Sequence, residues 1–233
     1  MAWTELACAE LEDGNLLTLR QCGSDFEIRF NLLELMSTRN PASERALAGI
    51  VCARIDCGTA NVLIGGLGLG YTLRAVLDRL GPDARATVAE LVPDVIAWNR
   101  GPLGAAAGRP LEDARVTVHA GDVAALVRAS PRAFDAVLMD VDNGPDAVLF
   151  EANRPLYGAA GIAGIMASLK PGGLLGLWSA DRSPGFEQVL ESCGLGFERE
   201  EVPVGGTGPA HTLYLVASGA ASTIVSTVRF SLV

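Results

Sequence analysis

From residue 60 onward, segments with the two-residue hydrophobic period of a strand take turns with segments that have the 3.6-residue period of a helix. Short apolar runs of strand type are separated by segments with helical periodicity. The runs are VLIGG (62–66), ATVAEL (86–91), RVTVHA (115–120), FDAVLMDV (134–141) and GGLLGLWSA (172–180). The helical segments are TLRAVLDRL (72–80), PDVIAWNR (93–100), VAALVRA (123–129), residues 159–169 and GFEQVLESCG (185–194). Strands that recur with helices between them predict βαβ crossovers and a mostly parallel sheet covered on both faces.

The C-terminal part breaks this alternation. Two strand candidates, FEREEVPV (197–204) and HTLYLVA (211–217), follow each other with only a Gly-rich turn between them. This spacing predicts an antiparallel hairpin that closes one edge of the sheet. We expect the final residues, 218–233, to form an added strand or a loose tail.

The N-terminal part has a different pattern. Residues 16–30 alternate on both sides of Gly23-Ser24, which predicts a β-hairpin. Residues 31–55 are interpreted as helical on either side of Asn40-Pro41, with Ser43 as the N-cap of a helix through Ala53. The predicted organisation is a hairpin and helix region over 1–58, an α/β domain over 59–217 and a tail over 218–233.

Composition and charge limit the partners. In 233 residues with 49% hydrophobic side chains, no apolar run approaches the ~20 residues of a membrane span. The net charge is −9 and Lys170 is the single lysine, so no basic stripe is available for nucleic acid. We expect no membrane and no nucleic-acid partner.

The N-terminal residues and the cysteines bear on location and on metal binding. The first fifteen residues carry acids and no basic residue, unlike a secretory signal, and we expect a cytoplasmic protein. The five cysteines are scattered without metal-ligand spacing, so no metal site is predicted.

A glycine loop follows the first strand of the α/β domain. It contains Gly65, Gly66, Gly68 and Gly70, at the edge of the sheet where open α/β folds bind ligands. The dinucleotide fingerprint fails because Tyr71 stands where its last glycine belongs, and the P-loop is excluded because no lysine follows. The alternative is a tight turn without any ligand.

Acidic residues end the next three strands. Glu90 follows the loop by about 20 residues, where an acid can accept hydrogen bonds from ribose hydroxyls. Asp122 follows the third strand, and taken alone it is typical of an N-cap for residues 123–129. Asp140 ends the fourth strand, with Asp142 two positions further. The loop and the acids together predict a nucleoside site that needs no phosphate contact.

Between about Asn61 and Trp178 the chain resembles the spermidine synthase group of the class I S-adenosylmethionine-dependent transferases. Those enzymes carry VLIIGGGDGGTLRE, VEID, a GD pair, DSSDPxGPAxxLF and LKPGG. The corresponding segments of this chain are VLIGGLGLGYTLRA, VAELVP, AGDVAAL, MDVDNGPDAVLF and LKPGGLL. The resemblance implies an α/β, Rossmann-like methyltransferase fold and a small N-terminal region of β-hairpin and helix.

The resemblance also implies roles for individual residues. Gly66, Gly68 and Gly70 would shape the loop under the donor, Glu90 would hold the ribose, and Asp122 with Val123 would meet the adenine. Asp140 would lie near the reacting end, and Asp142 falls where the family activates the amine. Asp142 would accept the amine proton with Asp140 in support. The alternative for Asp142 is a plain turn, because Asn143, Gly144 and Pro145 follow it.

Three departures from the family concern the reacting groups. The loop aspartate that contacts the donor's aminopropyl end is Leu69 here. The Tyr-His-Glu segment that helps to bind the diamine becomes Ala42-Ser43-Glu44, and the DSSDP segment is shorter, with Asn143 in place of proline.

The function expected from these features is transfer of an alkyl, aminopropyl-type group to a small-molecule amine. The donor is S-adenosylmethionine or its decarboxylated form. One alternative is a small-molecule methyltransferase, which Leu69 favours, and another is a non-catalytic adenosyl-nucleoside-binding protein. A homodimer is possible, as is common in the family.

Overall fold

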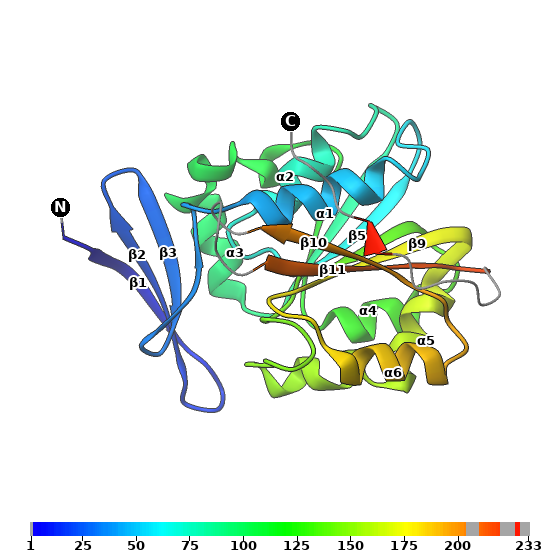
Figure 1. The fold of residues 1–233 in the computed structure, drawn as a ribbon. Helices are drawn as coiled ribbons and strands as arrows, with labels where there is room; N and C mark the ends of the chain where they lie inside the picture. The colour runs from blue at the N-terminus through cyan, green and yellow to red at the C-terminus, as the bar shows by residue number, and fades with distance from the viewer. Residues whose placement is uncertain (1, 204–209, 220–226, 229–233) are drawn as a thin grey trace.

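A small antiparallel sheet occupies the N-terminal side of the molecule (Figure 1). The computed structural model describes residues 2–203, 210–219 and 227–228. The small sheet has the order β1-β2-β3-β4, formed by β1 (Thr4–Glu10), β2 (Leu16–Cys22), β3 (Asp25–Phe30) and β4 (Leu33–Ser37). The predicted hairpin is confirmed as β2 and β3, in which Leu17 pairs with Phe30 and Cys22 with Asp25.

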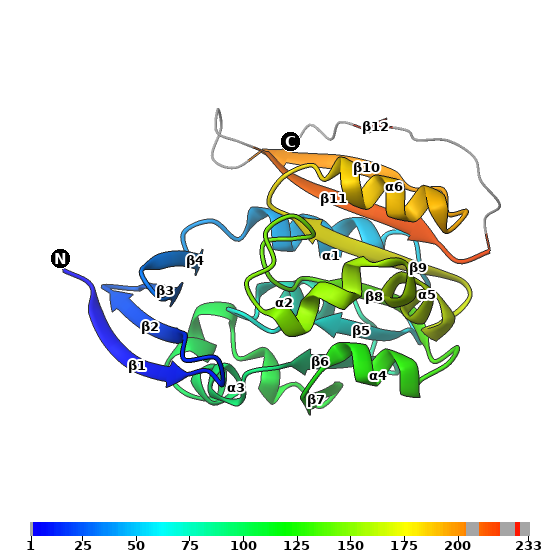
Figure 2. The ribbon, with the colours of Figure 1, turned by 90° about the horizontal axis from the view of Figure 1, so that it is seen from below.

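The larger sheet has the order β12-β10-β11-β9-β8-β5-β6-β7, and Figure 2 shows its strands. Its strands are β5 (Asn61–Gly65), β6 (Arg85–Glu90), β7 (Val116–Ala120), β8 (Phe134–Met139), β9 (Leu169–Ser179), β10 (Glu198–Pro203), β11 (Ala210–Ala217) and β12 (Thr227–Val228). Strands β5 to β9 pair in parallel, and β11 pairs antiparallel with β9 and β10. The mostly parallel, Rossmann-like sheet with an antiparallel C-terminal edge is confirmed.

Helices cover both faces of the larger sheet (Figure 1). They are α1 (Ala42–Cys52), α2 (Tyr71–Leu77), α3 (Pro93–Arg100), α4 (Val123–Ala129), α5 (Ala159–Ser168) and α6 (Pro184–Ser192), with 3-10 turns η1 (Leu103–Ala107), η2 (Pro110–Glu112) and η3 (Glu151–Tyr157). Helices α1, α2 and α3 contribute to one hydrophobic cluster, and α4, α5 and α6 to the other.

Strand alternation divides the core between these clusters. Val62 and Ile64 of β5 enter the first cluster, whereas Leu63 between them enters the second. All three side chains are fully buried, and such burial contributes ~1.5–3 kcal/mol for each aliphatic side chain. Because both faces are covered, the central strands are continuous apolar runs, as the sequence pattern indicates.

The sequence interpretation of residues 31–39 as helical is wrong. Residues Leu33–Ser37 form β4, which pairs with β3 through Arg29–Glu34 and Phe30–Leu33. The turn before β4 places Asn31 at a positive φ of 54°. The alternation Leu33-Glu34-Leu35 has the period of a strand, and pairing with β3 outweighs helix propensity over so short a segment.

The predicted cap of α1 is also wrong. The helix begins at Ala42 with Pro41 as the preceding residue, and no side chain caps it. Ser43 lies inside the first turn, where its hydroxyl donates to the side chain of Glu44. Strand β1 is a further element that the sequence pattern did not indicate.

The C-terminal hairpin is confirmed as β10 and β11, and its predicted Gly-rich turn lies outside the described residues. In the predicted tail, Thr227 and Val228 pair in parallel with β10, and the rest of 220–233 lies outside the description. The boundaries at 58 and 217 stay predictions. Within the described ranges, no helix combines the length and apolarity needed to cross a membrane.

Candidate active site

The glycine loop between β5 and α2 comes into very close contact with β8 and β4. A Cβ on Gly66, whose φ is +89°, would lie 2.0 Å from the backbone oxygen of Asp140. A Cβ on Gly68, whose φ is +50°, would lie 2.9 Å from the sulfur of Met36. Only glycine fits at Gly66, where the close atom is backbone, and at Gly68 the positive φ favours glycine while the Met36 side chain leaves little room. The loop therefore leaves open backbone at the carboxyl end of the sheet.

Two side chains hold this loop in place. The Glu90 carboxylate accepts hydrogen bonds from the backbone N–H of Leu67 at 3.0 Å and of Val92 at 2.9 Å. The Asn99 amide of α3 donates to the Gly68 carbonyl at 2.8 Å. Burial raises the pKa of Glu90, and the backbone N–H groups of Val92, Leu67, Gly68 and Leu91 oppose that shift. Two of these N–H groups, those of Leu67 and Val92, form hydrogen bonds of good geometry, whereas a carboxylate has about four lone-pair sites. Glu90 retains acceptor capacity for a ligand.

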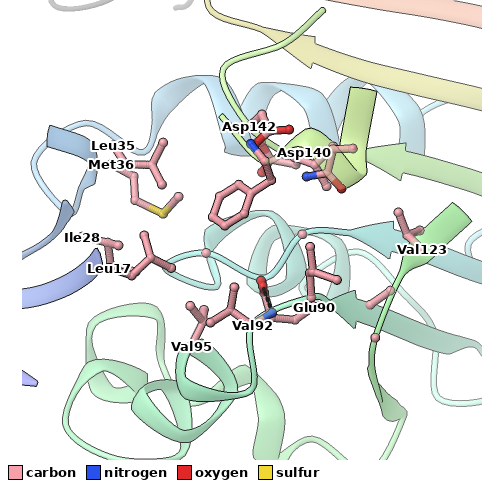
Figure 3. A pocket seen from close by; sticks show the side chains of 18 residues that line it. Leu17, Ile28, Leu35, Met36, Glu90, Val92, Val95, Val123, Asp140 and Asp142 are labelled. Carbon is pink, nitrogen blue, oxygen red and sulfur yellow. Dashed lines mark hydrogen bonds between the residues drawn. The ribbon is translucent and has the colours of Figure 1, made fainter. Parts of the chain in front are cut away.

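The first pocket, called the apolar pocket, opens beside this loop (Figure 3). Its apolar walls include Leu17, Ile28, Leu35, Met36, Leu91, Val92, Val95, Val123, Val141 and Phe150. Figure 3 shows Met36 of β4 pointing toward the loop, with Glu90 and the two aspartates at different sides of the pocket. The small sheet therefore supplies a wall to a site on the large sheet.

The second pocket, called the acidic pocket, lies between the glycine loop, α1 and the ends of β9 and β11. Its acidic lining residues are Glu34, Glu44, Asp140 and Asp142, and it is also lined by Ser43, Leu69, Tyr71, Thr72, Trp178 and His211. Asp140, Asp142, Gly68, Met36 and Leu35 belong to both pockets. No lysine or arginine occurs among the described residues that line either one. The two pockets meet at a pair of acids.

Asp140 lies at this junction, where its backbone N–H donates to the Gly65 carbonyl at 2.8 Å. The hydroxyl of Thr72 in α2 donates to Asp140 Oδ2. Burial, with a further contribution from the Glu44 charge, raises the pKa of Asp140 to about 7. Its protonation state therefore responds to charge in the acidic pocket near neutral pH.

Asp142 has an unusual backbone conformation, with a φ of 52°. Its Oδ1 accepts a hydrogen bond from the Phe150 N–H at 3.2 Å. Its buried Oδ2 has no hydrogen-bond partner among the described residues. Burial raises the pKa of Asp142, while the backbone hydrogen bond from Phe150 opposes the shift. A buried acceptor atom beside a pocket, on a backbone of rare geometry, is typical of a functional position.

The predicted site residues divide into two groups. Gly66, Gly68, Glu90, Val123, Asp140 and Asp142 line the apolar pocket. Asp122 and Gly70 do not belong to the lining of either pocket. The Asp122 carboxylate accepts from the Ala124 N–H at 2.7 Å, which confirms its N-cap role, and Gly70 precedes α2 in a left-handed conformation. The ligand contacts assigned to all these residues stay predictions.

Sequence reasoning missed several side chains that build the site. Met36 and Leu35 were missed because their strand was interpreted as helical. Thr72 and Asn99 were missed because a polar residue in a helical segment gives no sign of its buried partner. Asn99 is only 2% exposed, and only the fold shows that it reaches the loop. No group of three or more side chains suited to a metal ion occurs within the described residues.

Solved structures with this fold include three spermidine synthases. A spermidine synthase in complex with the transition state analogue AdoDATO has a TM-score of 0.73 at 15% identity, covering 92% of this chain and 72% of that chain. Spermidine synthase from Thermotoga maritima has a TM-score of 0.74 at 15% sequence identity, covering 92% of this chain and 73% of that chain. A probable spermidine synthase from Corynebacterium glutamicum has a TM-score of 0.63 at 17% sequence identity, covering 93% of this chain and 80% of that chain. These similarities define a Rossmann-like fold of the spermidine synthase type.

The family follows from the sequence match. Residues 42–188 match the spermine/spermidine synthase domain, which is more than half of the chain. The chain therefore belongs to the spermine/spermidine synthase family and is a transferase. The comparison with curated proteins gave no match.

Proposed function

We propose that the protein transfers an aminopropyl group from decarboxylated S-adenosylmethionine to a small-molecule amine. The observation that carries this proposal is the charge of the joined pockets. Glu34, Glu44, Asp140 and Asp142 line the acidic pocket, and no described lysine or arginine lines either pocket. Such a site favours ligands that bring positive charge and contain no carboxylate.

The apolar pocket suits the nucleoside half of the donor. Adenine presents flat apolar faces, and the pocket offers aliphatic walls and Phe150. Glu90 has unused acceptor capacity at the bottom of the glycine loop, where ribose hydroxyls can donate to it. No phosphate contact is required by a sulfonium nucleoside, in agreement with a loop that lacks basic residues.

The charge of the acidic pocket supports the decarboxylated form among the two possible donors. Intact adenosylmethionine carries a carboxylate on the same arm as its amine, close to the sulfonium. Two like charges ~4 Å apart repel each other by about 4 kcal/mol at an effective dielectric constant near 20. Beside Asp140 and Asp142 that carboxylate has no described cationic partner. The decarboxylated arm brings only an ammonium group, which these acids stabilise.

The reaction joins the contents of the two pockets at Asp140 and Asp142. The amine nitrogen attacks the methylene carbon bound to the sulfonium, a C–N bond forms, and the C–S bond breaks with its electron pair passing to sulfur. The products are the alkylated amine and neutral methylthioadenosine. The proton released from nitrogen passes to the carboxylate of Asp142, with Asp140 as the supporting charge. Because the sulfonium is already activated, placement of the nucleophile supplies most of the catalysis.

Methyl transfer is the second candidate. It is favoured by Leu69, which is 4% exposed and lines the acidic pocket where family members carry an acid. With Leu69 there, the loop itself offers no carboxylate to the amine of an aminopropyl arm. Transfer of the methyl group from the intact donor requires no such partner.

Calorimetry with three nucleosides tests the proposal. We expect the decarboxylated donor and methylthioadenosine to bind at least ~10-fold more tightly than intact adenosylmethionine, a difference of about 1.4 kcal/mol. Turnover is then measured over a panel of mono-, di- and polyamines. Preference for the intact donor would favour methyl transfer. Tight nucleoside binding without transfer to any amine would indicate a non-catalytic nucleoside-binding protein.

A further inference from the structure

Three side chains form a hydrogen-bonded chain that leads from β11 into the acidic pocket. His211 Nδ1 lies 2.9 Å from Ser43 Oγ, although the two residues are 168 positions apart. Ser43 Oγ donates a hydrogen bond of 2.7 Å to Glu44 Oε2. All three residues line the acidic pocket. The antiparallel edge of the sheet is thus connected to a carboxylate in the first turn of α1.

The direction of the hydrogen bonds follows from the number of protons. A serine hydroxyl has a single hydrogen, and that of Ser43 points to the Glu44 carboxylate. His211 Nδ1 must therefore carry the proton that it shares with Ser43 Oγ, which leaves Nε2 bare in the neutral ring. Burial lowers the pKa of His211, and the charge of Asp181 opposes this only in part. The ring is neutral at pH 7 and acts as a fixed donor.

Packing fixes the orientation of the donor ring. The rings of His211 and Trp178 meet edge to face with their centroids 4.7 Å apart. Ser43 is only 3% exposed, so water does not replace its hydroxyl. A free glutamate side chain loses about 1.5–2 kcal/mol of conformational entropy when it is ordered. Here that ordering is already present before a ligand binds.

We propose that His211 and Ser43 are positioning residues that hold the Glu44 carboxylate toward the acidic pocket, where it pairs with the ammonium group of the acceptor amine. This inference rests on the proposed function. Glu44 is close enough to Asp140 for its charge to act on that side chain, so the held carboxylate lies at the reacting end of the pocket. Neither His211 nor Ser43 touches the reacting atoms in this proposal.

Three variants remove or restore single links of the chain. His211→Phe keeps a ring against Trp178 but removes the N–H, whereas His211→Asn restores an N–H donor near the position of Nδ1. Ser43→Ala removes the bridging hydroxyl. A hydrogen bond to a charged group contributes about 1.5–3 kcal/mol, and 1.4 kcal/mol corresponds to a factor of ten. We therefore expect the KM for putrescine to rise about tenfold in His211→Phe and in Ser43→Ala.

The other kinetic constants separate positioning from general damage. We expect kcat and the KM of the decarboxylated donor to stay within about twofold in these variants, because the donor pocket is untouched. His211→Asn should restore most of the affinity for putrescine. Ser192→Ala is the matched control, since its hydroxyl bonds only the Val189 carbonyl on the exposed side of α6. Thermal unfolding is followed for each variant, and Ser43→Ala carries the test if His211→Phe does not fold.

Two results would overturn the inference. The first is an unchanged KM for putrescine in both His211→Phe and Ser43→Ala while the wild-type protein transfers to amines, which leaves the proposed function standing. If the wild-type protein transfers to no amine, the proposed function fails, and the carboxyl pKa of Glu44 is then measured by NMR in the free protein. A rise in that pKa in both variants supports the chain of three side chains, because the Ser43 hydrogen bond lowers it. An unchanged pKa is the second contrary result.

Discussion

The apolar pocket and the acidic pocket share Asp140 and Asp142 but are built in different ways. The apolar pocket takes much of its lining from the ends of consecutive strands, where Gly66 follows β5, Glu90 ends β6 and Val123 comes shortly after β7. The acidic pocket takes its polar groups from β4, α1, α2, β11 and the segment after β8, several of which are far apart in the chain. The first follows from the order of βα units, whereas the second exists only after folding.

Their hydrogen bonding differs in the same way. In the apolar pocket, Glu90 is bonded by backbone N–H groups of its own sheet edge. In the acidic pocket, Asp140 and Glu44 are bonded by the hydroxyls of Thr72 and Ser43. A single substitution can remove a side-chain donor without disturbing the fold. A backbone N–H donor in a βα unit cannot be removed in this way. The hydrogen bonds to Glu90 therefore depend on the fold itself, whereas those to Asp140 and Glu44 depend on two single side chains.

The largest effect is expected from Asp142→Asn, which acts where the two pockets meet. The amide cannot accept the amine proton, so kcat should fall by a factor on the order of 10²–10⁴. The dissociation constant of methylthioadenosine should change less than twofold. Stopped-flow or end-point product analysis gives the first quantity and calorimetry the second. Asp146→Asn, on an exposed residue of the same loop, serves as the control, and full activity of Asp142→Asn would refute the acid/base role.

The next effect separates the apolar pocket from the acidic one. Glu90→Ala removes the acceptor for the ribose and the partner of two backbone N–H groups, and hydrogen bonds to charged groups contribute about 1.5–3 kcal/mol. We expect methylthioadenosine to bind about 100-fold more weakly. The affinity of Glu90→Gln for methylthioadenosine should lie between those of Glu90→Ala and the wild type. Asp83→Ala, at an exposed acid before β6, should bind as tightly as the wild type. Retained nucleoside affinity in Glu90→Ala would contradict the ribose contact.

A smaller effect concerns the titration of Asp140. Its pKa is about 7 against an ordinary value of 3.8, with burial as the larger cause and the Glu44 charge as the second. Glu44→Gln should lower this pKa, measured by NMR of the side-chain carboxyl, without returning it to 3.8.

The raised pKa of Asp140 also makes the free energy of unfolding depend on pH. The folded protein binds a proton at Asp140 that the unfolded chain has released, so this group makes the free energy of unfolding fall as pH rises from 3.8 to about 7. Chemical denaturation at several pH values should show a shallower decline in Glu44→Gln. Because burial also raises the pKa of Glu44 itself, the shallower decline has two sources, and an unchanged pKa of Asp140 in the NMR titration of Glu44→Gln would show that the two acids do not interact.

The smallest effect tests Asp122, which the family resemblance places at the adenine. Its carboxylate caps α4 through the Ala124 N–H, and loss of such a cap costs about 1 kcal/mol. Asp122→Ala should therefore lower the free energy of unfolding by that amount, and Asp122→Asn should restore it, because asparagine caps equally well. A loss of nucleoside affinity beyond about tenfold in Asp122→Ala would instead establish a ligand contact.

Periodicity predicted the parallel sheet and its antiparallel edge because strand-type runs alternate with helical segments throughout that part of the chain. The segment 31–39 was misinterpreted because it adjoins the helical run after Pro41 without such an alternation, and only its pairing with β3 makes Leu33–Ser37 a strand. That mistake removed Met36 and Leu35 from the predicted site, although both line both pockets. Ser43 was misinterpreted as a cap because a serine before a helical run has that meaning locally, and its partner His211 lies on another strand.

By itself, the amino-acid sequence determined the order of strands and helices in the α/β domain, the glycine positions of the loop and the acids at the strand ends, because these depend on neighbours within a few residues. Only the tertiary structure decided which of those acids share a pocket. It placed Glu44 beside Asp140, covered the glycine loop with Met36 and left Asp122 as a helix cap. Charge and burial at a site depend on contacts between distant segments, and local patterns carry no record of those distances.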